Sequence, residues 1–165
     1  MEFLKVNGKI NPGKLALSVA VPLVGGSLSG AFANRNTKEE YAELKRPSFS
    51  PPPWIFPLAW TALYTSMELA KYRAAEKAAL KNETAKVLLP YNLQLGLNFL
   101  WSFLFFKWGL RGTALAEMVL MLATITWSAY VFYQYDQTAG NLMVPYIAWV
   151  MFAMGLNASI WWLNK

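Results

Sequence analysis

The segment from residue 143 to residue 163 reads MVPYIAWVMFAMGLNASIWWL and contains no charged side chain. About 20 apolar residues in an α-helix are enough to cross the hydrocarbon core of a bilayer. Four further runs are similarly long and apolar: Leu15–Ala33, Trp54–Tyr72, Val87–Phe106 and Thr113–Tyr133. Because backbone polar groups must be satisfied within the bilayer, the sequence predicts an all-α membrane protein, a bundle of five transmembrane helices.

The composition agrees with a membrane protein. Of the 165 residues, 56% are apolar and only 15% are charged, whereas a soluble domain has about a quarter charged residues. The chain has no cysteine and no histidine, so we expect no metal site, no resident cofactor and no catalytic triad built on His. The net charge of +6 comes from Lys and Arg scattered over the connections. That distribution is typical of membrane flanks, and we expect no nucleic-acid partner.

We expect one transmembrane domain over residues 1–165, with the first apolar run retained as a helix because it lacks the cleavage site of a signal peptide. The connection 34–53 is long and ends in the proline-rich stretch PSFSPPP. Proline restricts the backbone, so we expect this loop to be a stiff cover over a site. The connections 107–112 and 134–142 are predicted to be tight turns. Lys and Arg are shared almost equally between the two membrane faces, which leaves the orientation open.

Few polar side chains lie within the predicted helices. Gln94, Asn98 and Ser102 recur every four residues, so they share one face of the third helix. They either form hydrogen bonds between helices or line a ligand cavity, and the spacing alone favours hydrogen bonds. Glu68 has Lys71 three residues further on, which predicts an ion pair near the membrane surface. For Glu117 an interfacial role and a functional role stay equally open.

Eight tryptophans are more than the aromatic belts at the membrane surfaces require. Four lie at the ends of apolar segments: Trp54, Trp108, Trp161 and Trp162. The other four lie deeper: Trp60, Trp101, Trp127 and Trp149. Deep rings either fill the core or face a cavity that suits a large planar ligand. For Trp127 we expect core filling.

Three motifs in order along the chain resemble a known family. The first is KRPSFSPP at residues 45–52, followed by AWTALY at residues 59–64. The second is QLGLNFLW at residues 94–101, and the third is VPYIAW at residues 144–149, followed by GLN at residues 155–157. Together they are similar to the translocator protein family (TspO/MBR), whose members are also called tryptophan-rich sensory proteins and peripheral-type benzodiazepine receptors.

The resemblance implies a five-helix membrane bundle, commonly a homodimer, in which the first loop closes a ligand cavity. Ligands in the family include porphyrins such as protoporphyrin IX, cholesterol in animal members, and hydrophobic drugs, so we expect a porphyrin as ligand rather than as cofactor. Family members reside in bacterial membranes or the mitochondrial outer membrane, among others, and the sequence does not choose between them. Carried over residue by residue, the ligand-binding positions are Gly30, Ala33, Trp54, Trp60, Asn98, Trp101, Ser102, Trp149, Ala153 and Leu156.

The function implied by the resemblance is binding of porphyrins and hydrophobic drug-like molecules, with a role in tetrapyrrole sensing, transport or clearance. Two alternatives stay open: light-dependent porphyrin degradation, with Trp60 and Trp149 as catalytic residues, and a structural membrane scaffold. Animal members end the fifth helix with a cholesterol-recognition pattern that contains a tyrosine. Here Ala158 and Ser159 stand in its place, which argues against sterol binding at that position.

Overall fold

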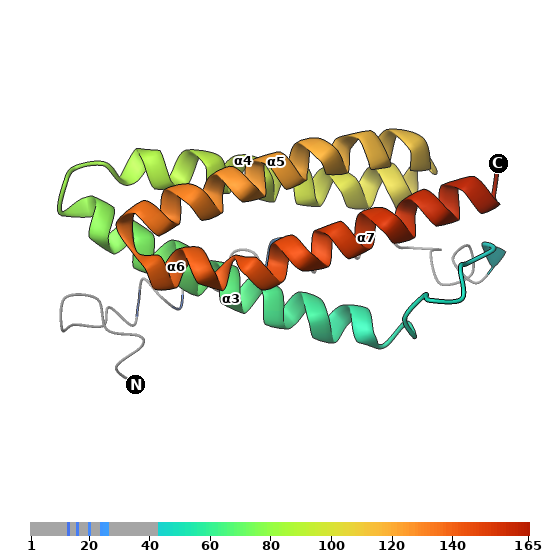
Figure 1. Cartoon of the computed structure of the whole chain (residues 1–165), viewed down its shortest axis with the longest axis horizontal. Coiled ribbons are helices and arrows are strands. Elements are labelled where there is room, and N and C mark those ends of the chain that lie inside the picture. Colours follow the sequence, from blue (N-terminus) through green and yellow to red (C-terminus); the bar gives the residue numbers. More distant parts are fainter. Residues whose placement is uncertain (1–12, 14–15, 17–19, 21–23, 27–42) are drawn as a thin grey trace.

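The computed structural model describes Gly13, Ala16, Ala20, residues 24–26 and residues 43–165. Throughout this part of the chain the regular elements are helices, which confirms the predicted all-α class. They are α3 (Ile55–Ala79), α4 (Thr84–Ser102), the π-helix η2 (Phe103–Lys107), α5 (Arg111–Tyr135), α6 (Gln137–Leu142) and α7 (Val144–Leu163). The long helices run side by side along the long axis of the molecule (Figure 1). The predicted first helix, residues 15–33, falls almost entirely outside the described residues.

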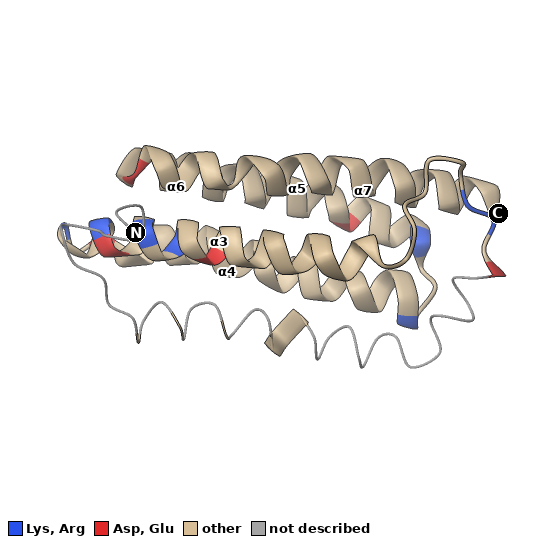
Figure 2. Cartoon of the chain, turned by 90° about the horizontal axis from the view of Figure 1, so that it is seen from below, with Lys and Arg blue, Asp and Glu red and all other residues tan. Residues whose placement is uncertain are grey.

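Two segments are long and apolar enough to cross a membrane, Arg111–Tyr135 and Gln137–Leu163. Only 33% of the most apolar window of each is buried inside the molecule. The outward-facing side chains include large apolar residues: Val119, Leu120, Tyr130, Val144 and Met151. Such a surface is suited to contact with lipid. Figure 2 shows that the charged residues lie mainly toward the two ends of the bundle, as expected of a chain that crosses a bilayer.

The core lies where the faces of the long helices meet. α5 packs against α4 and α7, while α3 packs against α4 and α6. Large side chains from each long helix are almost fully buried there: Met67, Tyr91, Met121, Ile125, Phe132 and Tyr146. The bundle therefore holds residues distant in the chain at fixed depths, and this places the sites described below.

Helix α3 extends beyond the predicted span 54–72 and ends at Ala79. The added segment reads RAAEKAA, in which alanine, glutamate, lysine and arginine all favour helix strongly. The end of an apolar run predicts where a helix leaves the hydrocarbon. The helix itself can continue beyond that point when the following residues favour helix. The sequence therefore predicted the helix but underestimated its length.

Three further expectations were wrong in detail. The third predicted helix, 87–106, would have placed Pro90 in its first turn, but α4 begins at Thr84 and Pro90 lies inside it. The connection 134–142 contains the short helix α6, which starts because the Asp136 side chain accepts a hydrogen bond from the backbone N–H of Ala139 at 2.9 Å. Trp127 is 44% exposed on the outside of α5 and does not fill the core.

Candidate ligand-binding site

Asn98 lies at the centre of a buried hydrogen-bonded group that joins three helices. Its Oδ1 accepts from the Tyr64 hydroxyl of α3 at 2.7 Å, and its Nδ2 donates to the Tyr146 hydroxyl of α7 at 3.1 Å. The Tyr146 hydroxyl in turn donates to Oε1 of Gln94 at 3.0 Å. We call Tyr64, Gln94, Asn98 and Tyr146 the polar cluster. It shows the hydrogen bonding between helices that the spacing of Gln94 and Asn98 predicted.

Aromatic rings adjoin this polar cluster. The Trp60 ring is half-buried, and its centroid lies 5.3 Å from that of Tyr64 and 6.3 Å from that of Tyr146. Trp149 is also half-buried and follows Tyr146 by three residues on α7. Its ring centroid lies 6.1 Å from that of Phe56. Flat apolar surfaces next to a few fixed polar groups are what small-molecule sites generally combine. The arrangement suits a large planar ligand that also carries polar groups.

The other predicted site residues divide between two regions. Trp60, Trp101, Trp149 and Ala153 all pack against the main core. Leu156 belongs to a second buried cluster with Phe105 and Ile160, against which Trp101 also packs. Ser102 is half-buried, while Trp54, directly before the first residue of α3, is 67% exposed. Gly30 and Ala33 lie outside the described residues.

Tyr64 and Tyr146 were not among the site residues predicted from the sequence. A signal was present, because both lie within the motifs AWTALY and VPYIAW, about one helical turn from Trp60 and Trp149 respectively. What could not be read from the motifs is that both hydroxyls meet Asn98. That contact depends on how three helices are rotated relative to one another, which the motifs do not show.

The described part of the predicted cover, residues 43–53, is attached to the end of α7 by Asn164. The side chain of Asn164 accepts from the backbone N–H of Lys45 at 3.0 Å and donates to its carbonyl at 2.9 Å. It also donates to the carbonyl of Ile160 at 2.7 Å. Further along the segment, the Phe49 ring lies edge-on against Phe152, with centroids 6.3 Å apart. Asn164 therefore holds the proline-rich segment next to the aromatic part of the site.

We expect Asn164→Ala to loosen residues 43–53 without unfolding the bundle, because the hydrogen bonds to Lys45 are exposed. Each such hydrogen bond contributes only about 1 kcal/mol. Trypsin should then cleave between Lys45 and Arg46 several-fold faster. Asn92→Ala, on an exposed face of α4, is the matched control. Equal cleavage rates in both variants and the parent would show that Asn164 does not restrain the segment.

The two acids within the predicted helices differ in their surroundings. Glu68 is fully buried and pairs with Lys71, as the spacing predicted, and also accepts from the Tyr91 hydroxyl. Glu117 is 7% exposed, and neither of its carboxyl oxygens has a hydrogen-bond partner among the described residues. Gln94 Nε2 is also buried, and the described part of the chain offers it no acceptor. Because burying such groups costs stability, Glu117 has the features of a functional position.

We expect Glu117→Gln to raise stability, by about 1 kcal/mol, because the substitution removes a buried charge that no described residue pairs with and keeps the side-chain volume. Chemical unfolding of the purified protein in detergent, followed by tryptophan fluorescence, measures the change. Glu43→Gln, at an exposed position outside the bundle, should leave the unfolding free energy unchanged. A clear loss of stability in Glu117→Gln would mean that the carboxyl group makes a favourable interaction in the folded protein.

Comparison with known proteins places these features in a family. Residues 18–163 match the TspO/MBR family. The tryptophan-rich sensory protein of Cereibacter sphaeroides is 40% identical over 126 residues, which are 76% of this chain and 77% of the relative. The tryptophan-rich protein TspO of Archaeoglobus fulgidus is 34% identical over 92% of this chain and 97% of its own. The translocator protein of Sus scrofa is 36% identical over 88% of this chain and 86% of its own. The chain therefore belongs to the TspO/MBR family of five-helix membrane proteins, a family with sensory and transport-related members.

Proposed function

We propose that this protein binds a porphyrin, or a hydrophobic drug-like molecule of similar shape, and acts in tetrapyrrole sensing, transport or clearance. The observation that carries the proposal is the half-buried ring of Trp60 lying against Tyr64 and Tyr146, whose hydroxyls both bond to Asn98. A porphyrin has a wide apolar face and polar carboxylates. The apolar face would stack on the Trp60 ring, and the carboxylates would form hydrogen bonds with the polar cluster.

The same proposal includes a homodimer that crosses the membrane several times. Family resemblance supports both statements, and the lengths of α3, α4, α5 and α7 are sufficient for crossing. Sterol binding is not part of the proposal, because the expected tyrosine is replaced near Ala158.

Titration with protoporphyrin IX in the dark, followed by tryptophan fluorescence in detergent, tests the proposal. We expect saturable quenching with a Kd in the micromolar range, or about −8 kcal/mol. Trp60→Phe and Trp149→Phe should each weaken the Kd several-fold. Trp162→Phe, at a ring that is 70% exposed near the chain end, should leave it unchanged. Linear quenching, or the same Kd in all variants, would mean partition into the micelle and would refute the proposal.

A second candidate function is light-dependent degradation of the bound porphyrin. It is favoured by the 5.3 Å separation of the Trp60 and Tyr64 rings, because an electron passed from Trp60 to an excited porphyrin can then be replaced from the tyrosine. With oxygen as the final oxidant, illumination should convert bound protoporphyrin IX into a product with a new absorption band. Trp60→Phe should slow that conversion when the rates are compared at equal porphyrin occupancy. The occupancy is calculated from the Kd measured in the dark. Equal bleaching in parent and variant, at equal occupancy, would exclude a role for Trp60.

A further inference from the structure

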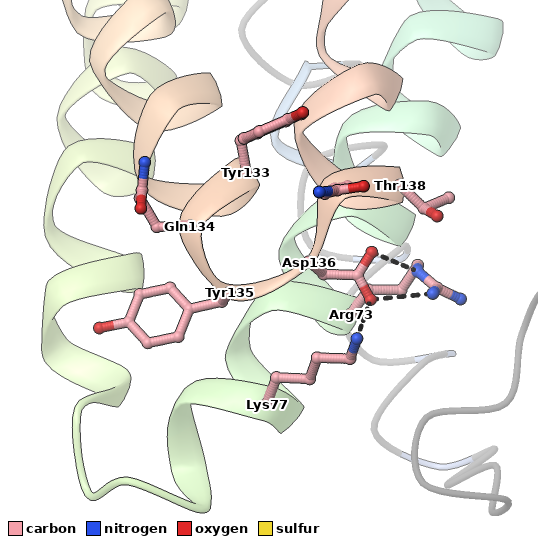
Figure 3. Close-up of a pocket in the computed structure, with 8 residues that line it drawn as sticks. Arg73, Lys77, Tyr133, Gln134, Tyr135, Asp136 and Thr138 are labelled. Carbon is pink, nitrogen blue, oxygen red and sulfur yellow. Dashed lines mark hydrogen bonds and ion pairs between the residues drawn. The ribbon is translucent and has the colours of Figure 1, made fainter.

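A polar pocket of about 450 Å³ opens where α5 turns into α6 (Figure 3). We call it the interface pocket. Arg73 and Lys77 of α3 line one part of it. The rest is lined by the end of α5, by Asp136 and by the start of α6: Tyr133, Gln134, Tyr135, Asp136, Gln137 and Thr138. It lies at the opposite end of the bundle from the C-terminus and the described cover segment (Figure 1). The interface pocket is therefore distinct from the candidate ligand-binding site.

Among the described residues that line the interface pocket, positively charged side chains outnumber negatively charged ones. One carboxylate, Asp136, pairs with both cations, at 2.9 Å from Arg73 Nη2 and 2.9 Å from Lys77 Nζ, and Figure 3 shows both side chains converging on it. Burial raises the pKa of Asp136, but the hydrogen bonds from Arg73 and Lys77 outweigh this effect and hold it below its usual range. Asp136 is thus ionised at neutral pH, and the three groups together carry one net positive charge.

Lys77 retains the capacity to bind a further anion. Its side chain is 39% exposed, and an ammonium group has three N–H donors, of which the contact with Asp136 needs one. The hydroxyl of Thr138 and the amide of Gln134 line the same pocket and supply further donors. A phosphate group, with several strong acceptor oxygens, matches this set.

The interface pocket also lies at the turn between the two candidate membrane spans. The two candidate membrane spans, Arg111–Tyr135 and Gln137–Leu163, adjoin each other at Asp136, so the pocket is at the boundary of the hydrocarbon. On the α5 side, Tyr130 and Tyr133 are 65% and 46% exposed, as expected of an aromatic belt. A lipid with its phosphate in the pocket could therefore lay its acyl chains along the exposed face of α5.

We propose that the interface pocket binds the phosphate of an anionic membrane phospholipid through Lys77 and Thr138. An anionic lipid fits better than a zwitterionic one, because a headgroup ammonium needs an acceptor and the Asp136 carboxylate is already engaged by two cations and a backbone N–H. A free phosphate ion offers the same oxygens. The position of the pocket at the hydrocarbon boundary favours the lipid.

Thermal unfolding of the full chain in detergent, with phosphatidylglycerol or phosphatidylcholine added to the micelles, tests the proposal. Ligand that binds only the folded protein raises Tm. We expect phosphatidylglycerol to raise Tm several degrees more than phosphatidylcholine does. Lys77→Gln should reduce that difference at least two-fold. Thr138→Val, which keeps every charge and every contact of Asp136, should also reduce it, so the test does not depend on the stability of one variant.

Two controls separate a specific site from surface charge. Lys81→Gln also removes one positive charge, just beyond the end of α3. The Lys81 Nζ lies 5.7 Å from the centroid of the Tyr135 ring, and Lys81 does not itself line the pocket. Lys107→Gln removes a positive charge at the other end of the bundle. Both should keep the full lipid effect. Equal losses in Lys81→Gln and Lys77→Gln, or equal effects of the two lipids on the parent, would overturn the proposal. Equal stabilisation by inorganic phosphate would overturn the assignment to a lipid.

Discussion

Asp136→Ala should lower the free energy of unfolding by about 3 kcal/mol, because removing one partner of a buried ion pair is strongly destabilising. Asp136 is 3% exposed and holds Arg73, itself 9% exposed, together with Lys77. The substitution also removes the side-chain acceptor of Ala139 N–H at the start of α6. Both losses act on the contact between α3 and the α5–α6 connection, so we expect the effects to add.

Chemical unfolding in detergent, followed by circular dichroism, measures this change. Asp136→Asn separates the two contributions, because asparagine caps helices well but carries no charge. We expect its loss to be smaller than that of Asp136→Ala by about 1 kcal/mol. Glu43→Ala, at an exposed position outside the bundle, is a control expected to change stability by less than about 1 kcal/mol. A similarly small effect of Asp136→Ala would contradict the importance of the buried cluster.

Acid should weaken the same contact. The pKa of Asp136 is held below its usual range by Arg73 and Lys77, against the opposing effect of burial. A carboxyl group with a lowered pKa contributes its full stabilisation above its unfolded value of about 3.9, and this is lost as the pH falls through the folded-state pKa. Unfolding measured from pH 6 downward should therefore show a steeper loss of stability in the parent than in Asp136→Asn. Identical slopes would contradict the lowered pKa.

Asn98→Leu should have the second large effect, a loss of about 2 kcal/mol or more together with weaker porphyrin binding. The Tyr64 hydroxyl would lose its acceptor, and the Tyr146 hydroxyl would lose the donor that now bonds to it. A buried polar group without a partner costs about 1–3 kcal/mol. Porphyrin binding depends on the same hydroxyls in our proposal, so the Kd should rise several-fold.

A double-mutant cycle distinguishes this explanation from simple misfit of the leucine. Tyr64→Phe removes the hydroxyl that Asn98→Leu leaves without an acceptor. The double variant should therefore lose about 1 kcal/mol less unfolding free energy than the sum of the two single losses. Asn92→Leu, on the exposed side of the same helix, should be nearly neutral. Strict additivity of Asn98→Leu and Tyr64→Phe would show that the two side chains do not interact energetically.

Features that depend on position along one helix were predictable from the sequence. Apolar length identified each long helix in the described part of the chain, because the thickness of the bilayer and the rise of an α-helix set the length of such a run. The helical period placed Gln94 and Asn98 on one face, and the three-residue spacing predicted the Glu68–Lys71 pair, both of which the structure contains. The family followed from three short motifs.

Features that depend on a partner far along the chain needed the tertiary structure. Arg73 and Asp136 are 63 residues apart, and Lys45 and Asn164 are 119 residues apart. Trp127 shows the same limit, because lipid is as apolar as the core and hydrophobicity cannot say which of them a ring will face. Length, period and composition determined which segments are helices and which faces are polar. Only packing decided how each helix is rotated, and therefore that Tyr64 and Tyr146 meet at Asn98 and that two cations share Asp136.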